Sequence, residues 1–537
     1  MYARFPAVRL GFAVMPISLK IFLAGAWLAC ACAQGATTYY VSTSGNDGND
    51  GKTKTTAWQH APGMQGCSGT CGAAKPAAGD QFILRGGDTW FGNGGGSPTG
   101  LPWNWRWSGT STGRIYIGVD TSWFSGSAWH RPVLSSGNPT STSTVGSCPH
   151  DDTRFGYVSL NSVDYVTFDN VEFTGLCWSA TPGYGSASYL GVTAAHNASS
   201  GANLIISNNY FHGWTHTACG SGCDSMVMLG ITYSNLGQGN QYIRNVVDGS
   251  DTDGRSMYAL FGDCYDFHEN VVRYVANGPV CNNMHTFHDN LIENVSESFA
   301  SPGMHSNSFE FNAEWSGNNF VYNNVVRHNF NANSSGEVNI WVTPSHTDYY
   351  FNNVVYDIGG GVSGNYWDIE SGGTAYFYNN TLEMGRAAIR YQLQTSHANF
   401  YNNHFITQNG GTSLTSLMDN ANGSIIVGSN NVIQSTTQAN SQGYTASNNY
   451  SPTSSSGATV NAGANYTSVC SAAGSDLCRD TTLAVTYDAS RHLVTGPGRA
   501  AVARPSTGSW SAGAFFSASG PSQNQILPPT NLTSTIK

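Results

Sequence analysis

The chain has 537 residues, of which only 10% are charged, while 40% are hydrophobic and 12% are aromatic. This composition excludes a disordered chain, because it supplies enough apolar surface for a large core. The 63 glycines, together with many Asn, Ser and Thr residues, disfavour a helix-rich fold, since these residues prefer turns and strands. The formal net charge of −10 argues against nucleic-acid binding, because no basic patch is present to contact phosphates.

The first 33 residues have the features of an export signal. Basic residues precede an apolar stretch at 21–29, and Ala31-Cys32-Ala33 offers the small-residue pattern after which a signal peptidase cuts. A lipoprotein signal around Cys30 or Cys32 matches less well. The apolar stretch is too short to span a bilayer, and no other segment of the sequence comes close. We therefore expect a secreted or periplasmic protein without a membrane span, after cleavage near Ala33.

Of the 12 cysteines, Cys30 and Cys32 lie in this signal segment, and an even number follows it, as an oxidising compartment favours. A zinc site at Cys219 and Cys223 is disfavoured, because no second pair of ligands matches it. We expect disulfides between cysteines close in sequence: Cys67–Cys71, Cys148–Cys177, Cys219–Cys223, Cys264–Cys281 and Cys470–Cys478.

A short sequence motif recurs through the middle of the chain: alternating apolar residues, an asparagine, and a further apolar pair. Period-two alternation predicts short strands with one buried face. An asparagine at the same corner of every coil can hydrogen-bond to its neighbours, about 4.8 Å away. Because the spacing is unequal, we expect three-strand coils that are joined by turns of variable length and stack into one core. The copies centre on Asn170, Asn209, Asn245, Asn270, Asn290, Asn324, Asn353, Asn380, Asn403 and Asn431.

This repeated motif resembles that of the right-handed parallel β-helix of pectate-lyase-like proteins, and the resemblance covers about residues 36–520. The segments 38–48 and 79–88 resemble the first strands of that superfamily, and 509–516 resembles its closing strand. The resemblance implies an all-β fold: a single right-handed parallel β-helix of three-strand coils with an Asn ladder, a Trp-rich N-terminal cap region and a short C-terminal tail. Its activity is not specified by the fold.

These features divide the chain into consecutive parts. We expect the signal peptide at 1–33, the β-helix at 34–520 and a Pro-containing tail at 521–537. Within the helix, we expect the N-terminal cap and first coils at 34–155, regular coils at 156–435, and C-terminal coils or a cap at 436–520.

The alternation also sorts polar residues by face. Outward positions three residues after the repeat asparagine form a charged row, which is either a substrate groove or, as we favour, an exposed stripe of ion pairs worth at most about 1 kcal/mol each. Positions two residues before it carry aromatic rings, which we expect to form an internal stack. His285 and His288 are three residues apart on a strand and so face opposite ways, which disfavours a metal site. The charged row is His212, Asp248, Arg273, Glu293, Arg327, Tyr356 and Glu383, and the aromatic row is His268, His288, Tyr322, Phe351, Tyr378 and Tyr401.

Four neighbouring coils present polar residues on the outward positions of their first strand. Phe309 and Phe311 are expected to be buried, which turns Glu310 outward. In the superfamily that the chain resembles, the substrate groove runs along this side. The wall comprises the carboxylates Glu310, Glu337, Asp368 and Glu370, the amides Asn312, Asn339 and Gln392, the indole of Trp341 and the guanidinium of Arg390.

The resemblance implies two chemistries for this wall. In a lyase that acts on an acidic glycan, Glu337, Asp368 and Glu370 would hold Ca²⁺ by their oxygens, and Arg390 would act as the base in β-elimination. In a glycoside hydrolase, the carboxylates, Glu310 included, would act as acid and base. We favour the lyase. A third interpretation is a non-catalytic, carbohydrate-binding β-helix.

Trp103, Trp105 and Trp107 alternate along one segment, which places three indoles on one face. If exposed, this face would bind substrate by stacking on sugar rings; if buried, it would close the end of the helix. We expect a polysaccharide partner and a monomeric protein.

Overall fold

The computed structural model describes residues 35–92, 94–152, 156–160, 163–179, 187–188, 202–217, 225–231, 239–252, 257–282, 284–296, 307–312, 317–329, 338–341, 347–358, 367–370, 373–384, 391–393, 397–407, 413–419, 423 and 425–517. Those from Ala36 onward belong to one compact unit. The expected signal segment and tail lie outside the described residues. No helix among the described residues is long and apolar enough to span a bilayer.

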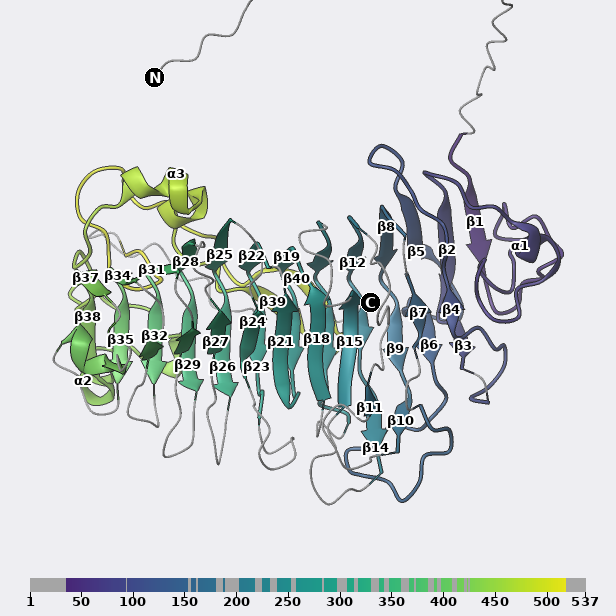
Figure 1. Ribbon diagram of the computed structural model, residues 1–537, viewed down its shortest axis with the longest axis horizontal. Coiled ribbons are helices and arrows are strands. Elements are labelled where there is room, and N and C mark those ends of the chain that lie inside the picture. The colour runs from purple at the N-terminus through teal and green to yellow at the C-terminus, as the bar shows by residue number, and fades with distance from the viewer. Residues whose placement is uncertain are drawn as a thin grey trace, which may run out of the picture. The chain divides into compact units, whose positions relative to one another are not determined.

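Most of the described strands are short and parallel and form three long sheets, A, B and C, which successive coils extend by one strand each (Figure 1). Sheet A contains, in order, β1 (Thr38–Val41), β2 (Gln81–Gly86), β5 (Ile115–Phe124), β8 (Val166–Asp169), β12 (Ile205–Ser207), β16 (Gln241–Ile243), β19 (Asp266–His268), β22 (Thr286–His288), β25 (Asn318–Tyr322), β28 (Thr347–Phe351), β31 (Thr374–Tyr378), β34 (His397–Tyr401) and β37 (Ile425–Ser429). Sheet B contains β3 (Thr89–Phe91), β6 (Val133–Ser135), β9 (Glu172–Thr174), β13 (Tyr210–Phe211), β17 (Val246–Asp248), β20 (Val271–Arg273), β23 (Leu291–Glu293), β26 (Val325–Asn329), β29 (Val354–Ile358), β32 (Thr381–Met384), β35 (His404–Thr407) and β38 (Val432–Ser435). Sheet C contains β11 (Ala187–Ser188), β15 (Ser225–Ile231), β18 (Met257–Asp263), β21 (Asn277–Asn282), β24 (Phe309–Asn312), β27 (Val338–Trp341), β30 (Trp367–Glu370), β33 (Tyr391–Leu393) and β36 (Met418–Asp419).

The remaining elements are short. Two further parallel pairs, β4 (Trp103–Asn104) with β7 (Val158–Ser159) and β10 (Leu176–Trp178) with β14 (Trp214–His216), accompany the sheets, and β39 (Val485–Asp488) pairs antiparallel with β40 (Leu493–Pro497). The helical turns are α1 (Gly69–Ala73), α2 (Thr436–Ser441), α3 (Cys470–Ala473), η2 (Leu414–Leu417), η3 (Ala446–Asn448), η4 (Thr467–Val469) and η5 (Ser475–Cys478). The all-β, parallel β-helix that we predicted is confirmed.

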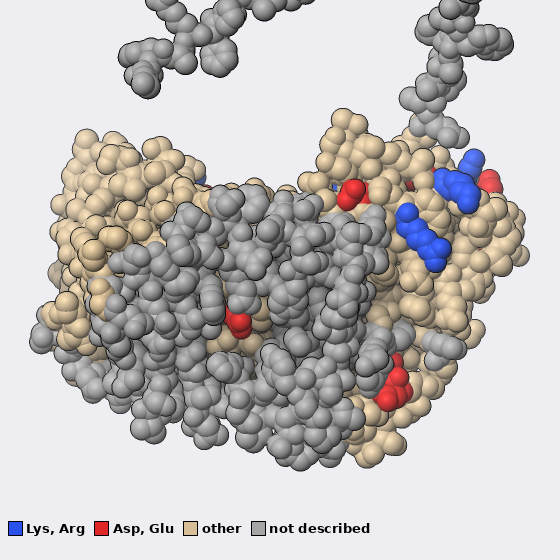
Figure 2. Space-filling view, viewed as in Figure 1, with Lys and Arg blue, Asp and Glu red and all other residues tan. Residues whose placement is uncertain are grey.

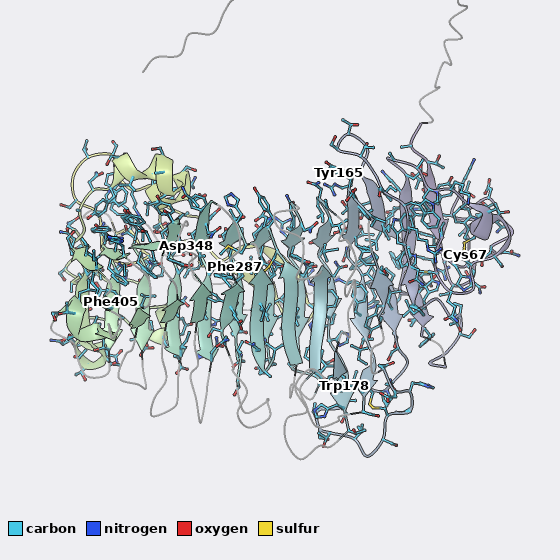
Figure 3. The ribbon with its side chains drawn as sticks, viewed as in Figure 1. Cys67, Tyr165, Trp178, Phe287, Asp348 and Phe405 are labelled. Carbon is cyan, nitrogen blue, oxygen red and sulfur yellow. A yellow bond between two sulfur atoms is a disulfide. The ribbon has the colours of Figure 1, made fainter. Side chains whose placement is uncertain are left out.

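The coils stack on a core of alternating apolar residues, as the period-two pattern requires. Inside sheet A, aromatic rings of successive coils lie face to face; the Tyr350, Phe377 and Phe400 centroids are each 4.7 Å from the next. Phe287 and Phe405, which are labelled in Figure 3, belong to the same buried cluster, from sheets A and B respectively. The core is therefore continuous from coil to coil, because no single coil buries its own apolar face.

The predicted Asn ladder is present at the corner between sheets A and B. From Asn209 to Asn431, each side-chain Nδ2 donates to the Oδ1 of the asparagine one coil later, at 2.9–3.2 Å. The same Oδ1 also accepts the backbone N–H of the preceding ladder asparagine. Each buried amide is thus satisfied by its neighbours, so the ladder fixes the register between coils.

Asn170 does not belong to the ladder, contrary to our assignment of the first copy. Its backbone is left-handed, with φ of 61°, so it occupies the position before the ladder. Val171 takes the ladder position and donates its N–H to Asn209 Oδ1 at 3.0 Å. Most copies contain two adjacent asparagines, and the second of them is the ladder residue. This copy contains only one asparagine, so we placed the ladder position one residue too early.

The residue before each ladder asparagine turns the corner. From Asn208 to Asn430 these residues have φ of 53–58°, a conformation that asparagine tolerates better than most residues. The left-handed turn directs their side chains outward, and several of those in the later coils bind a C-terminal strap, residues 436–517. Asn352, Asn379 and Asn402 donate from Nδ2 to strap carbonyl groups of Asp476, Ser511 and Ala464, respectively, at 2.8–3.0 Å.

The strap occupies residues 436–517, within the segment 436–520 where we expected C-terminal coils or a cap, and it forms no further coil of the three long sheets. It runs back along the helix, so that Ala484 N–H donates to Asn323 O and Arg131 donates to the carbonyl group of His492, from a much earlier coil. The segment 509–516, expected to be a closing strand, forms only an isolated antiparallel bridge between Trp510 and Gly463. Polar turn-rich composition does not distinguish a further coil from a segment packed over existing ones.

The strap also buries the charged row, which we expected to be solvated. Arg273 Nε lies 3.7 Å from Asp248 Oδ2, and Arg273 Nη1 lies 3.4 Å from Glu293 Oε1. Charges of opposite sign therefore alternate along the row, as the sequence predicts. Asp248 and Glu293 are nevertheless buried. Tyr487 of the strap donates its hydroxyl to Asp248 Oδ2 at 2.9 Å. The row is an internal polar layer between sheet B and the strap.

The aromatic row also differs from expectation. The rings do stack, with 4.8 Å between His268 and His288 and 4.6 Å from His288 to Tyr322. They lie on the outer face of sheet A, because the neighbouring Phe267 and Phe287 fill the interior. His268 and His288 are half-buried, not core residues, and further along the same row the strap covers the rings.

Four of the five predicted disulfides are present: Cys67–Cys71, Cys148–Cys177, Cys264–Cys281 and Cys470–Cys478. Cys219 and Cys223 lie outside the described residues. The bridges fit an extracellular or periplasmic location, where thiols are oxidised.

One carboxyl group is buried inside the helix. Asp348, labelled in Figure 3, accepts hydrogen bonds from Asn319 Nδ2 and Tyr350 Oη, each at 3.0 Å, and is fully enclosed. Because burial disfavours the charged form, the pKa of Asp348 is raised to about 7.

We predict that Asn353→Ala destabilises the fold by about 1–3 kcal/mol, because it leaves buried partners on both neighbouring coils unsatisfied. These partners are Val321 O and the side chains of Asn324 and Asn380. Urea unfolding measures the loss. Asn440→Ala, on the exposed face of α2, is the matched control and should leave the unfolding midpoint unchanged.

We predict that Asp348→Asn stabilises the protein more at pH 8 than at pH 5. Between about pH 4 and 7 the native state holds a proton that the unfolded chain has lost, so wild-type stability falls as pH rises through this window. The stability of the Asp348→Asn variant lacks this dependence on pH, because asparagine does not titrate. Thermal unfolding of both proteins at each pH gives the difference, and a difference that stays constant from pH 4 to 8 would contradict the prediction.

Candidate functional site

The register of sheet C aligns polar residues from five consecutive strands. Glu310 of β24 pairs with Asn339 of β27, Asn339 with Asp368 of β30, Asp368 with Gln392 of β33, and Gln392 with Asp419 of β36. We call these five positions the polar row. Neighbouring strands are about 4.8 Å apart, so the row extends over about 19 Å. Four of its members were predicted from the sequence; Asp419 was not.

Glu310 shows how the sequence directs this row. Phe309 and Phe311 are each 1% exposed and fill the core, which leaves Glu310 between them half-buried on the outer face. Asn307, itself buried, donates from Nδ2 to Glu310 Oε2 at 3.0 Å. The carboxylate is therefore held in place from the turn that precedes its strand.

Sequence reasoning missed this supporting turn. The backbone N–H of Asn307 donates to Asn277 Oδ1 at 2.9 Å, and the Gly278 N–H donates to the carbonyl of Asn307 at 2.8 Å. A Cβ at Gly278 would lie 1.9 Å from the Ser308 carbonyl oxygen, so only glycine fits. The glycine near the start of β21, in the Asn-Gly pair at 277–278, was the available signal, because a glycine within a strand marks the close approach of another backbone segment.

A second row runs two residues further along the same strands. Trp341 pairs with Glu370, and Asn312 follows Glu310 at the same interval on β24. Asp368 and Glu370 are thus neighbours on one strand, about 6.6 Å apart along the backbone. Glu337 and Arg390 lie outside the described residues, and for Asn312, Asn339, Trp341, Asp368, Glu370 and Gln392 the description ends at the backbone.

The described side chains hold no group of three His, Cys, Asp or Glu residues that could bind a metal ion. Ca²⁺ prefers carboxylate and carbonyl oxygens, and the predicted ligands Glu337, Asp368 and Glu370 are all carboxylates. Their chemistry therefore fits this ion, and Asp368 and Glu370 are placed on one strand by the backbone.

Of the two interpretations left open for the indole face, the structure shows burial for Trp103 and Trp105, which are 0% and 1% exposed and so cannot stack on a sugar ring. Trp103 Nε1 donates to Pro62 O at 2.9 Å, and its ring packs edge-on against Phe168 of sheet A. Trp107 is half-buried against the same core. The alternation was interpreted correctly, but the indole face turns inward.

The geometry defines a parallel β-helix protein with a row of carboxyl and amide residues along one sheet. No known protein family profile matches the chain, and no curated protein matches it. Among solved structures, it is similar to a pectate lyase, at 13% identity over 90% of this chain and 97% of that one, with a TM-score of 0.36. It is also similar to a rhamnogalacturonan lyase, at 13% identity over 74% and 87%, with a TM-score of 0.36, and to a GH136 lacto-N-biosidase from Eubacterium ramulus, at 12% over 74% and 67%, with 0.38. At these identities the similarity concerns the fold alone.

Proposed function

We propose that the chain is a carbohydrate-active enzyme that cleaves an acidic, uronate-containing polysaccharide by β-elimination along the outer face of sheet C. The observation that supports this proposal most directly is the polar row, in which stacked coils repeat carboxyl and amide positions at intervals of about 4.8 Å. Side chains at such intervals suit an extended chain of sugar units lying along the helix.

Each residue of the wall has a role in this proposal. Asp368, Glu370 and Glu337 would hold Ca²⁺, which supplies positive charge that neutralises a uronate carboxylate and acidifies the adjacent C–H. Asn339 and Gln392 offer amide groups to sugar hydroxyls, as Asn312 does in the second row. Trp341 would stack on a sugar ring, because an indole has a large apolar face.

Arg390, one residue before β33, would remove the proton beside the uronate carboxyl group. The C–O bond to the leaving sugar then breaks, its electrons remain with the leaving oxygen, which takes up a proton from solvent, and a C=C bond forms in the remaining ring. Because the pKa of a guanidinium is above about 12, only the small neutral fraction of Arg390 can accept the proton near neutral pH, so the C–H must be strongly acidified. This requirement links the arginine to the neighbouring carboxylates.

A hydrolase on the same wall is the second candidate, favoured by one spacing. The Glu310 and Asp368 positions are two strand intervals apart, about 9.6 Å along the sheet. Inverting glycosidases place their two carboxyl groups about 6.5–9.5 Å apart, to admit a water molecule, and this strand spacing lies just above the upper end of that range. Glu310, held by Asn307, would then be one of the two catalytic carboxyl groups.

One assay separates these functions. The protein is incubated with acidic and neutral polysaccharides, with Ca²⁺ or with chelator, while the ultraviolet absorbance of unsaturated uronide and the number of reducing ends are followed together. The lyase requires both signals, and only with Ca²⁺. Reducing ends without absorbance identify the hydrolase, and binding without either signal indicates a non-catalytic protein.

We predict that Asp368→Asn raises the Ca²⁺ concentration for half-maximal activity about tenfold or more, because it removes a charged ligand. Calcium titration of the absorbance signal measures this shift. Asp50→Asn, at an exposed turn near the N-terminus, is the matched control. An Asp368→Asn variant that cleaves as well as wild type in low Ca²⁺ would exclude this carboxylate from the site.

We predict that Arg390→Ala lowers kcat by about 10²–10⁴-fold, as expected for loss of the group that transfers the proton. Arg106→Ala, an exposed arginine of the N-terminal coils, should retain activity. Full activity of Arg390→Ala would exclude Arg390 as the base, while leaving the hydrolase, which depends on Glu310 and Asp368, to be tested by reducing-end release.

A further inference from the structure

A group of ionisable residues lies beneath one part of the strap, on sheet B. Charged residues make up only 10% of the chain, and over the described part of the face drawn in Figure 2 they are few and scattered. Beneath the hairpin formed by β39 and β40, by contrast, charged side chains come together from five consecutive strands of sheet B, β6 to β20, or from residues next to them. The hairpin therefore rests on a polar surface as well as on an apolar one.

Three aromatic rings join the tip of this hairpin to sheet B. Tyr210 of β13 stacks on His212, two residues further along the chain, and on His492, which precedes β40. Both centroid distances are 4.1 Å, the ring planes lie within 8° of one another, and the two histidine centroids are 6.4 Å apart. We call these three rings the histidine clasp. Arg131 holds the same tip, because its Nη2 donates to the His492 carbonyl oxygen at 3.0 Å.

His212 carries a positive charge. Its Nδ1 lies 2.7 Å from Asp251 Oδ2, and its Nε2 lies 3.0 Å from Glu172 Oε1. Because a carboxylate only accepts hydrogen bonds, both ring nitrogens must donate, which requires the doubly protonated ring. Burial opposes this charge, but the hydrogen bonds with Asp251 and Glu172 outweigh it and raise the pKa of His212 to about 9. One ring beside Tyr210 is therefore cationic at neutral pH.

His492 is the titratable ring that belongs to the hairpin itself. Tyr487 donates its only hydroxyl hydrogen to Asp248 Oδ2 at 2.9 Å. The same hydroxyl oxygen lies 3.0 Å from His492 Nδ1 and so accepts a hydrogen bond from it. A neutral imidazole with its proton on Nδ1 makes this bond. The neutral ring is thus satisfied where it lies, half-buried between the strap and sheet B.

The charges that face His492 come from the elements packed against the hairpin. Burial lowers the pKa of His492, and the positive charges of His212 and Arg131 lower it further. The carboxylates of Asp248 and Asp251 act in the opposite sense. The net shift is downward, so the surroundings favour the neutral ring.

The carboxylates around the clasp already lie beside positive groups. The pairs are Asp251 and Glu172 with His212, Asp248 with Arg273 and, within the hairpin, Asp488 with Arg491. A proton on His492 would therefore add a positive charge where the nearby negative charges are already paired. It would also place that charge on a ring whose centroid is 6.4 Å from that of the charged His212.

We propose that the histidine clasp is a pH-sensitive latch, which holds the β39–β40 hairpin on sheet B at neutral pH and releases its tip in mild acid. Protonation of His492 is the trigger, because it places a second imidazolium against Tyr210, close to that of His212. Once released into water, His492 regains its ordinary pKa of about 6.5, which is above its pKa in the clasp. The released form therefore binds more protons, so the closed form loses stability as the pH falls through about 6.5.

Release of the tip would uncover part of the apolar cluster beneath the strap. Val485 and Val494 of the hairpin share this buried cluster with Val246 of sheet B. The base of the hairpin is held separately, because the Ala484 N–H donates to Asn323 O at 3.0 Å. The inference does not depend on the proposed enzyme function, since the clasp lies on sheet B and the polar row on sheet C.

Hydrogen exchange of the full chain at pH 7.5 and pH 5, corrected for intrinsic exchange rates, tests the latch. We expect the protection of the hairpin amides, residues 485–497, to fall about tenfold in acid while β31 keeps its protection. His492→Phe retains a ring that can stack on Tyr210 but cannot titrate, so its hairpin should be equally protected at both pH values. The lost bond to Tyr487 lowers both values alike. His397→Phe, which removes an exposed histidine of β34, is the matched control and should respond to pH as wild type does.

Three results would overturn the proposal: hairpin protection that acid leaves unchanged in wild type, a fall that is as large in His492→Phe, or an equal fall in β31. The second result would mean that a carboxylate, not His492, releases the tip, and the third that the whole helix opens. Asp348 cannot mimic the latch, because its titration destabilises the fold as the pH rises, not as it falls. Far-ultraviolet circular dichroism at both pH values confirms that each variant is folded.

Discussion

The Asn ladder is the constraint on which the rest of the molecule depends. Each ladder amide from Asn209 to Asn403 is buried and hydrogen-bonded both to the coil before it and to the coil after it. Slipping one coil by a residue would leave buried amides unpaired, at a cost of about 1–3 kcal/mol for each. Because the ladder fixes the register between coils at this corner, it also fixes the register of the strands in sheet C. Glu310, Asn339 and Asp368 therefore align, although 29 residues separate each from the next.

The same corner determines what covers the outside. Because the residue before each ladder position is left-handed, its side chain points away from the core, and in several of the later coils it meets the strap. The strap adds apolar contacts: Val485 and Phe515 join the outward valines of sheet B in one buried cluster. Charges beneath it lose their water, so the alternation of Asp248, Arg273 and Glu293 has a structural purpose: each buried charge has an opposite charge beside it.

Period-two alternation and the recurring asparagine were sufficient to predict the coils, the ladder and the outward position of Glu310, because these features are local and repeat. The strap could not be predicted, since its contacts join residues as distant as Arg131 and His492, and nothing local distinguishes it from a further coil. Burial of Trp103 and Trp105 was undetermined for a related reason: alternation shows that residues share a face but not whether that face turns inward. The support that Asn307 gives to Glu310 depends on a turn that does not repeat.

The distribution of these contacts favours sheet C as the working face. Among the described residues, the strap contacts sheets A and B and the corner between them. The polar row lies on the third sheet, where Glu310 stays half-buried although both of its neighbours are fully enclosed. Carboxyl and amide positions repeated on a sheet face give little stability by themselves, because exposed polar groups exchange protein contacts for water at small gain. The proposed function would account for their alignment, because a ligand that extends along the coils needs the rigid spacing that the ladder supplies.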